Sequence, residues 1–148
     1  MSMDDLELFG NLDHIGIVVK DLDKAVEFYK SIGVTDFKKS GTPGKNKTLH
    51  GKPLVGGKTT MVMGRMGGVG IQVTQPIEPP SMSYEFLEEV GEGINHLAYR
   101  VKNLPAVHEE MIKRGYKIIF TSEYIDGGGE IYVDTGNNFC WQFFEELW

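Results

Sequence analysis

An internal repeat is the feature that most constrains the fold of this chain. Residues 13–22 read DHIGIVVKDL and residues 95–104 read NHLAYRVKNL. In both segments a histidine follows an acid or an amide, and the match ends on a lysine, an Asp or Asn, and a leucine. Self-similarity of this kind predicts two copies of one structural unit. We therefore expect two small modules related by a pseudo-twofold axis within the 148 residues.

Each copy begins with the pattern of a strand followed by a helix. β-Branched and alternating residues predict strands over 15–19 and 97–101. Apolar residues then recur at helical spacing from Ala25 to Ile32 and from Val107 to Ile112. Further strand-like runs, separated by glycines, cover residues 59–63, 69–74, 116–122, 130–134 and 139–145.

The order of these segments predicts an α+β fold in which two tandem βαβββ modules form a curved mixed-sheet cleft. The predicted boundaries are 11–75 for the first module, 76–92 for a linker with one short helix, and 93–148 for the second module. Prolines at positions 76, 79 and 80 mark the linker. A fold of this kind leaves sheet edges to cover, which favours a homodimer.

Composition and charge exclude several classes of protein. With 41% hydrophobic and 24% charged residues, the chain is neither disordered nor fibrous. A single cysteine, Cys140, cannot form an internal disulfide, so we expect a reducing, cytoplasmic location. No apolar run reaches 18 residues and the start MSMDDLELFG is acidic, so we expect neither a membrane span nor a signal peptide. A net charge of −6 argues against a nucleic-acid partner.

The charge is unevenly distributed along the chain. Residues 37–77 contain no Asp or Glu and hold seven Lys and Arg residues, whereas the remainder has 8 basic and 21 acidic residues. One interpretation is a solvated loop rich in glycine and lysine. The other is a basic lip on the cleft that receives a small anionic ligand.

The repeat also places polar residues at matching positions. His14 and His96 are equivalent, and a pseudo-twofold axis would bring them together. Gln72 and Gln142 are lone amides in the last strand of each module, and a buried amide must find partners. Two imidazoles and two amide oxygens suit a divalent ion such as Co, Ni, Zn or Mn. The alternative is an inert, hydrogen-bonded centre without a metal.

The openings DHIGIVVKDLDKAVEFY and GEGINHLAYRV, with the closing glycine-rich strand pair, resemble the vicinal-oxygen-chelate superfamily. Its members include glyoxalase I, extradiol dioxygenases, bleomycin-resistance proteins and methylmalonyl-CoA epimerases. GEGINHLAYRV followed by the glycines at 127–129 is most similar to the epimerase branch. The resemblance covers nearly the whole chain and implies metal ligands at His14, Gln72, His96 and a fourth position, here Gln142.

The activity implied by the resemblance is that of a metal-dependent isomerase or epimerase acting on an acyl thioester, such as a CoA thioester. The family usually has glutamate at the fourth position, whereas Glu145, the nearest acid of the last strand, should point to the opposite face. With no anion among the four ligands, the catalytic residues stay unassigned. Substrate contacts are expected at Lys58, Thr59, Arg65, Gly128 and Gly129.

The same resemblance leaves three alternatives open. One is a lyase like glyoxalase I, and another is a dioxygenase, which the missing carboxylate disfavours. The third is a non-catalytic module of the same fold that binds a small anion or a drug.

Overall fold

In the computed structural model, which describes residues 2–148, three α-helices accompany one ten-stranded mixed sheet. The helices are α1 (Leu22–Ser31), α2 (Met82–Glu89) and α3 (Leu104–Lys113), preceded by a single 3-10 turn, η1 (Met3–Leu6). The strands are β1 (Leu12–Val18), β2 (Thr35–Lys39), β3 (Gly44–Leu49), β4 (Lys52–Pro53), β5 (Lys58–Met66), β6 (Val69–Glu78), β7 (Gly93–Arg100), β8 (Ile118–Tyr124), β9 (Gly128–Asp134) and β10 (Cys140–Glu146). Within the described range, no helix has the length and apolar character needed to cross a membrane.

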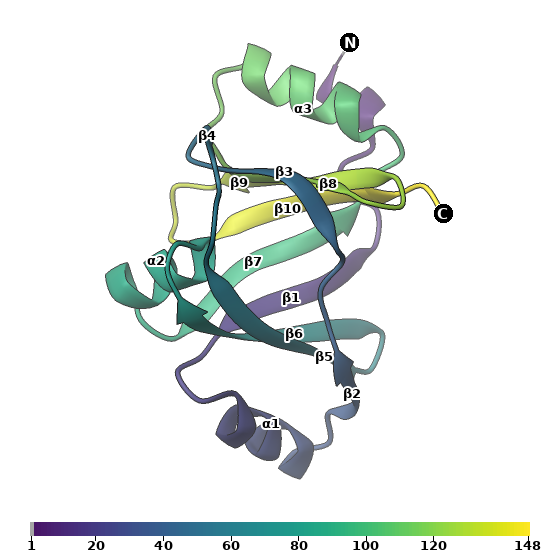
Figure 1. The fold of residues 1–148 in the computed structure, drawn as a ribbon. Helices are drawn as coiled ribbons and strands as arrows, with labels where there is room; N and C mark the ends of the chain where they lie inside the picture. The colour runs from purple at the N-terminus through teal and green to yellow at the C-terminus, as the bar shows by residue number, and fades with distance from the viewer. Residues whose placement is uncertain (1) are drawn as a thin grey trace.

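The two copies of the repeat meet at the centre of the sheet, whose order is β2-β5-β6-β1-β7-β10-β9-β8-β3-β4. β1 and β7 pair antiparallel, and each is flanked by the parallel last strand of its own half, β6 or β10. Figure 1 shows α1 and α3 at opposite ends of the molecule, with the curved sheet between them. This arrangement confirms the predicted α+β fold with a curved mixed sheet.

The Asp or Asn of the repeat begins a helix in each half. The Asp21 Oδ1 accepts a hydrogen bond from the Lys24 amide at 3.1 Å, and the Asn103 Oδ1 accepts one from the Ala106 amide at 3.2 Å. Such a side chain satisfies a backbone N–H that has no partner within the helix. This part of the repeat therefore fixes the start of α1 and of α3.

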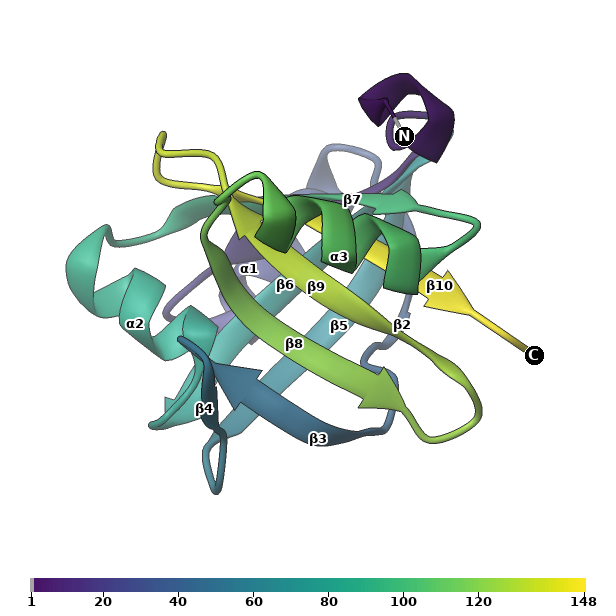
Figure 2. The same cartoon turned by 90° about the horizontal axis from the view of Figure 1, so that it is seen from above.

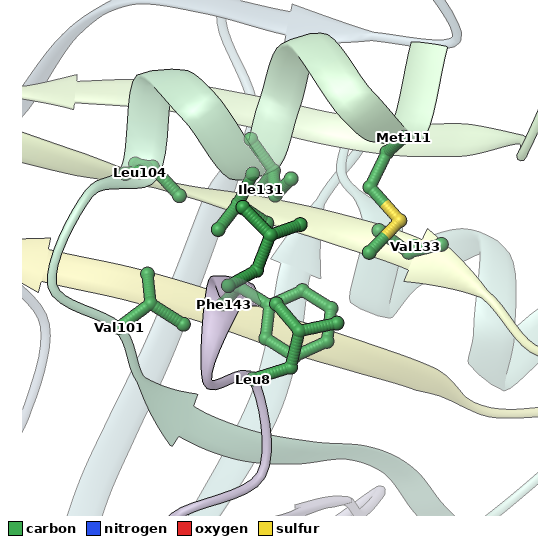
Figure 3. Packing of buried hydrophobic residues seen from close by; sticks show 9 residues of the cluster. Leu8, Val101, Leu104, Met111, Ile131, Val133 and Phe143 are labelled. Carbon is green, nitrogen blue, oxygen red and sulfur yellow. The ribbon is translucent and has the colours of Figure 1, made fainter. Parts of the chain in front are cut away.

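α1 and α3 pack against one face of the sheet, each over an apolar cluster. Under α3, an apolar cluster joins the helix to β9 and β10, and it includes Leu8, Val101, Leu104, Met111, Ile131, Val133 and Phe143 (Figure 3). A second cluster, formed by Val19, Leu22, Val34, Ile71 and Val73, lies at α1. Because side chains alternate along a strand, the residues between these core positions point to the concave face.

The acid-free window is not a solvated loop, so that interpretation was wrong. Its segments β3 and β4 are strands that do not join the other strands of the first half. Instead, β3 pairs with β8 of the second half. The Thr48 and Thr121 hydroxyls are hydrogen-bonded at 2.6 Å, and the Asn46 amide donates to the Glu123 carboxylate at 2.6 Å. Figure 2 shows β3 lying beside β8. Polar residues form a strand here because the open edge of β8 supplies their backbone partners.

Candidate functional site

The concave face of the sheet holds a cavity of about 370 Å³. A cavity of this size accommodates a small molecule. Strands of both halves line it, and all four residues of the predicted ligand set, His14, Gln72, His96 and Gln142, are in the lining.

The structure brings the two repeat histidines together at the centre of this cavity. The Nε2 atoms of His14 and His96 are 3.3 Å apart, and the two ring planes are nearly perpendicular, at 88°. Both side chains are buried. The strand register explains the meeting, because His14 pairs with Ala98 and His96 pairs with Gly16 across the central β1–β7 junction.

The outer nitrogen of each imidazole is held by the preceding residue. His14 Nδ1 donates to the Asp13 carboxylate at 2.7 Å, and His96 Nδ1 donates to the Asn95 amide oxygen at 2.8 Å. The Nε2 atom of each ring is thereby turned toward the other, an arrangement that favours a shared cation. Burial lowers the pKa of His96 well below its usual range, which keeps the imidazole in the neutral form that binds metals.

Gly16 makes room for the ring of His96. The glycine pairs with Gln72 on one side and with His96 on the other. A Cβ at this position would lie 1.9 Å from His96 Cε1. The close approach of the His96 ring to β1 thus requires a glycine at position 16.

The two amides of the predicted set differ in their surroundings. Gln72 Nε2 donates to the Ser40 hydroxyl at 3.1 Å. Gln142 Nε2 donates to the Glu130 carboxylate at 2.7 Å, whereas the buried Gln142 Oε1 has no hydrogen-bond partner among residues 2–148. A buried acceptor without a partner costs about 1–3 kcal/mol, so this oxygen is a natural ligand atom.

Glu130 is the residue that sequence reasoning missed. It lines the cavity, and its Oε2 accepts hydrogen bonds from Gln142 and, at 2.7 Å, from the Tyr124 hydroxyl. Burial raises the pKa of its carboxyl group. The expectation of a centre without an acid is therefore corrected: the four symmetric positions are neutral, but β9 adds a carboxylate. The sequence contained a signal for this position. Ile131 and Val133 are buried on one face of β9, so strand alternation places Glu130 on the opposite, cavity-lining face.

The expected substrate contacts divide into two groups. Lys58 and Thr59 line the cavity, as does Lys47 of β3, and neither lysine forms an ion pair within the described chain. The remaining three positions, Arg65, Gly128 and Gly129, lie outside the lining.

Close packing of the backbone accounts for Gly128. A Cβ there would lie 1.9 Å from the Glu145 backbone oxygen. The Glu145 carboxylate itself accepts from the Leu104 amide at 3.1 Å and so points away from the cavity. Strand alternation had indicated this orientation.

The residues at the centre fit a divalent ion only if amide oxygens take part. Nowhere in residues 2–148 do three His, Cys, Asp or Glu side chains lie close enough to hold a metal. The separation of 3.3 Å between the two Nε2 atoms suits a shared ion, since ligands at about 2.0–2.1 Å from one ion stand about 2.9–3.4 Å apart. Gln142 Oε1, which is buried and has no hydrogen-bond partner among residues 2–148, is an amide oxygen available for such a role.

Comparison with known proteins identifies the family. The model of the Glyoxalase/Bleomycin resistance protein/Dioxygenase superfamily matches residues 13–133. The uncharacterized protein YqjC of Bacillus subtilis (strain 168) is 27% identical over 125 residues, which cover 75% of this chain and 81% of that protein.

Solved structures share the fold at low identity. Methylmalonyl-CoA epimerase from Mycobacterium tuberculosis superposes with a TM-score of 0.65 at 20% identity, covering 99% of this chain and 93% of its own. A Streptomyces coelicolor methylmalonyl-CoA epimerase variant in complex with 2-nitronate-propionyl-CoA gives 0.64 at 19% identity, covering 93% and 97%. With the family model matching most of its length, the chain belongs to the Glyoxalase/Bleomycin resistance protein/Dioxygenase superfamily.

Proposed function

We propose that this protein is a metal-dependent isomerase of the epimerase type, which moves the proton next to the carbonyl of an acyl thioester. The observation that carries the proposal is the pair of facing imidazole nitrogens in the same cavity as the unpartnered Gln142 oxygen. Two imidazole nitrogens and an amide oxygen in one cavity are a donor set for a divalent ion. The likeness to epimerase structures supports the choice of reaction class.

Four side chains would hold the ion: His14, His96, Gln142 through Oε1, and Gln72. The metals that suit these donors are Co, Ni, Zn and Mn. When bound, such an ion stabilises the negative charge that develops on a carbonyl oxygen as the neighbouring carbon loses its proton. Asp13 and Asn95 keep the two imidazoles oriented toward the ion.

Glu130 is the proton acceptor in this proposal. Its Oε2 is held by Tyr124 and Gln142, whereas its Oε1 has no hydrogen bond to any other part of the described chain. Partial burial in the cavity makes it a stronger base than a carboxylate in water. Lys47 and Lys58 provide positive charge for an anionic substrate, such as a CoA thioester.

A proton-exchange experiment tests the proposed function. The protein loaded with Co²⁺ is incubated with methylmalonyl-CoA in D₂O, and the α-proton signal is followed by NMR. We expect exchange well above that of chelator-treated protein. Thioester binding without exchange would overturn the proposal in favour of a non-catalytic binding module. If the protein turned over the hemithioacetal of methylglyoxal but not methylmalonyl-CoA, the activity would be that of a lyase.

The proposal includes a cytoplasmic homodimer. Among residues 2–148, the edge strands β2 and β4 each have one side without a strand partner, and pairing between copies would cover such edges. We expect light scattering to give twice the 16.6 kDa mass of one chain. A mass of one chain at micromolar concentration would contradict the dimer.

A further inference from the structure

Two hydrogen bonds fix which end of the Gln142 amide faces the centre. Glu130 Oε2 accepts from both the Tyr124 hydroxyl and Gln142 Nε2, each at 2.7 Å. The bond to Glu130 Oε2 therefore holds the NH₂ end of the Gln142 amide toward β9. A flipped amide would instead place its oxygen against the carboxylate, and two acceptors at that distance repel each other. The Gln142 oxygen is therefore directed away from Glu130, where it has no partner in residues 2–148.

We propose that Glu130 is a positioning residue that presents Gln142 Oε1 to the ion, and that its carboxylate takes the place of the glutamate that the family pattern has at position 142. The inference rests on the proposed metal centre. Compared with the family pattern, the carboxylate stands on β9 instead of β10. In this inference it acts on the ion through the Gln142 amide and does not bind the ion itself.

The register between β9 and β10 allows this exchange of roles. Gln142 pairs with Tyr132, and Glu130 pairs with Phe144, so Glu130 and Gln142 are diagonal neighbours on the same face. Diagonal cross-strand positions are within reach of long side chains. A hydrogen bond from the amide to a carboxylate also polarises the amide and increases the negative charge on its oxygen. The ligand oxygen thus receives part of the charge that a glutamate would supply.

Calorimetric titration with Co²⁺ tests the positioning role. In Glu130→Gln the new amide can donate its own NH₂ group to Gln142 Oε1 and so occupy the ligand oxygen. We expect Co²⁺ affinity to fall about 10–100-fold, the usual effect of removing a group that orients a ligand. Glu130→Ala, which removes the acceptor without adding a donor, should weaken binding to a similar extent.

The exchange of the two side chains provides the decisive rescue. The double variant Glu130→Gln/Gln142→Glu restores a carboxylate–amide hydrogen bond and places an anionic oxygen at the ligand position. We expect its Co²⁺ affinity to return at least to that of the wild type. Glu123→Gln is the matched control, because it removes one carboxylate from β8 outside the cavity. Its affinity should not change.

Several outcomes would overturn the inference. Unchanged Co²⁺ affinity in both Glu130→Gln and Glu130→Ala would show that Glu130 does not orient the ligand. A folded double variant that binds no better than Glu130→Gln would have the same meaning. The visible spectrum of bound Co²⁺ reports the change of ligand, and circular dichroism confirms folding. A wild type that binds no Co²⁺ overturns both proposals, whereas Glu130-dependent binding without proton exchange overturns only the proposed function.

Discussion

Replacing His96 with alanine should abolish tight uptake of a divalent ion while the fold survives. The variant removes one of two imidazole nitrogens that stand 3.3 Å apart, and His14 alone cannot hold the ion with neutral amides. The loss leaves the buried Asn95 oxygen without its donor, at a cost of about 1–3 kcal/mol. That cost is smaller than the usual stability of a domain, about 5–15 kcal/mol. Calorimetry with Co²⁺ and circular dichroism measure the two effects.

The matched control for this change is His108→Ala on α3. That histidine lies outside the lining of the central cavity, so its removal should leave Co²⁺ uptake unchanged. Wild-type affinity in His96→Ala would show that His96 is not a ligand and that the four-residue centre is wrong.

A single methyl group at Gly16 on β1 should also disrupt the pair of histidines, because it would displace the His96 ring on β7. In Gly16→Ala the new Cβ would lie 1.9 Å from His96 Cε1, so the ring must leave its place. The ring is buried and hydrogen-bonded to Asn95, and it cannot move without breaking that bond. We expect a loss of about 1–3 kcal/mol in the free energy of unfolding. We also expect at least a tenfold weaker affinity for Co²⁺.

Gly10→Ala provides the comparison for Gly16→Ala. A Cβ at Gly10 would have no heavy atom within 4 Å. We expect a change within about 0.5 kcal/mol, as for ordinary surface substitutions. Denaturant unfolding with and without Co²⁺ measures both variants. If Gly16→Ala keeps wild-type stability and affinity, the position of the His96 ring does not depend on this glycine.

The repeat made most of the fold predictable. Each copy has a strand that contains a histidine and then a helix, which indicated that two equivalent modules pair. The antiparallel pair of central strands, β1 and β7, agrees with this prediction. Alternation also indicated the strands that pack under α1 and α3, because their apolar positions need a helix to cover them.

β3 and Glu130 were not predictable in the same way. The sequence GKNKTL of β3 has almost no apolar alternation, and its strand conformation depends on the free edge of β8 more than seventy residues away. Glu130 has no counterpart in the first half, so a search for symmetric polar residues passed over it. Its contact with Gln142 depends on the register of β9 and β10, which the pattern of one strand does not specify.

The crossing of β3 also affects the order in which the molecule can assemble. Its bonds to β8 join Thr48 to Thr121 and Asn46 to Glu123, contacts that close loops of 73 and 77 residues. Closing long loops reduces chain entropy and slows folding. β3 can pair with β8 only after residues 118–124 have been synthesised. A ribosome-bound chain that ends before residue 118 therefore leaves the β8-facing edge of β3 unpaired until the second half is synthesised, and only β4 pairs with β3 until then.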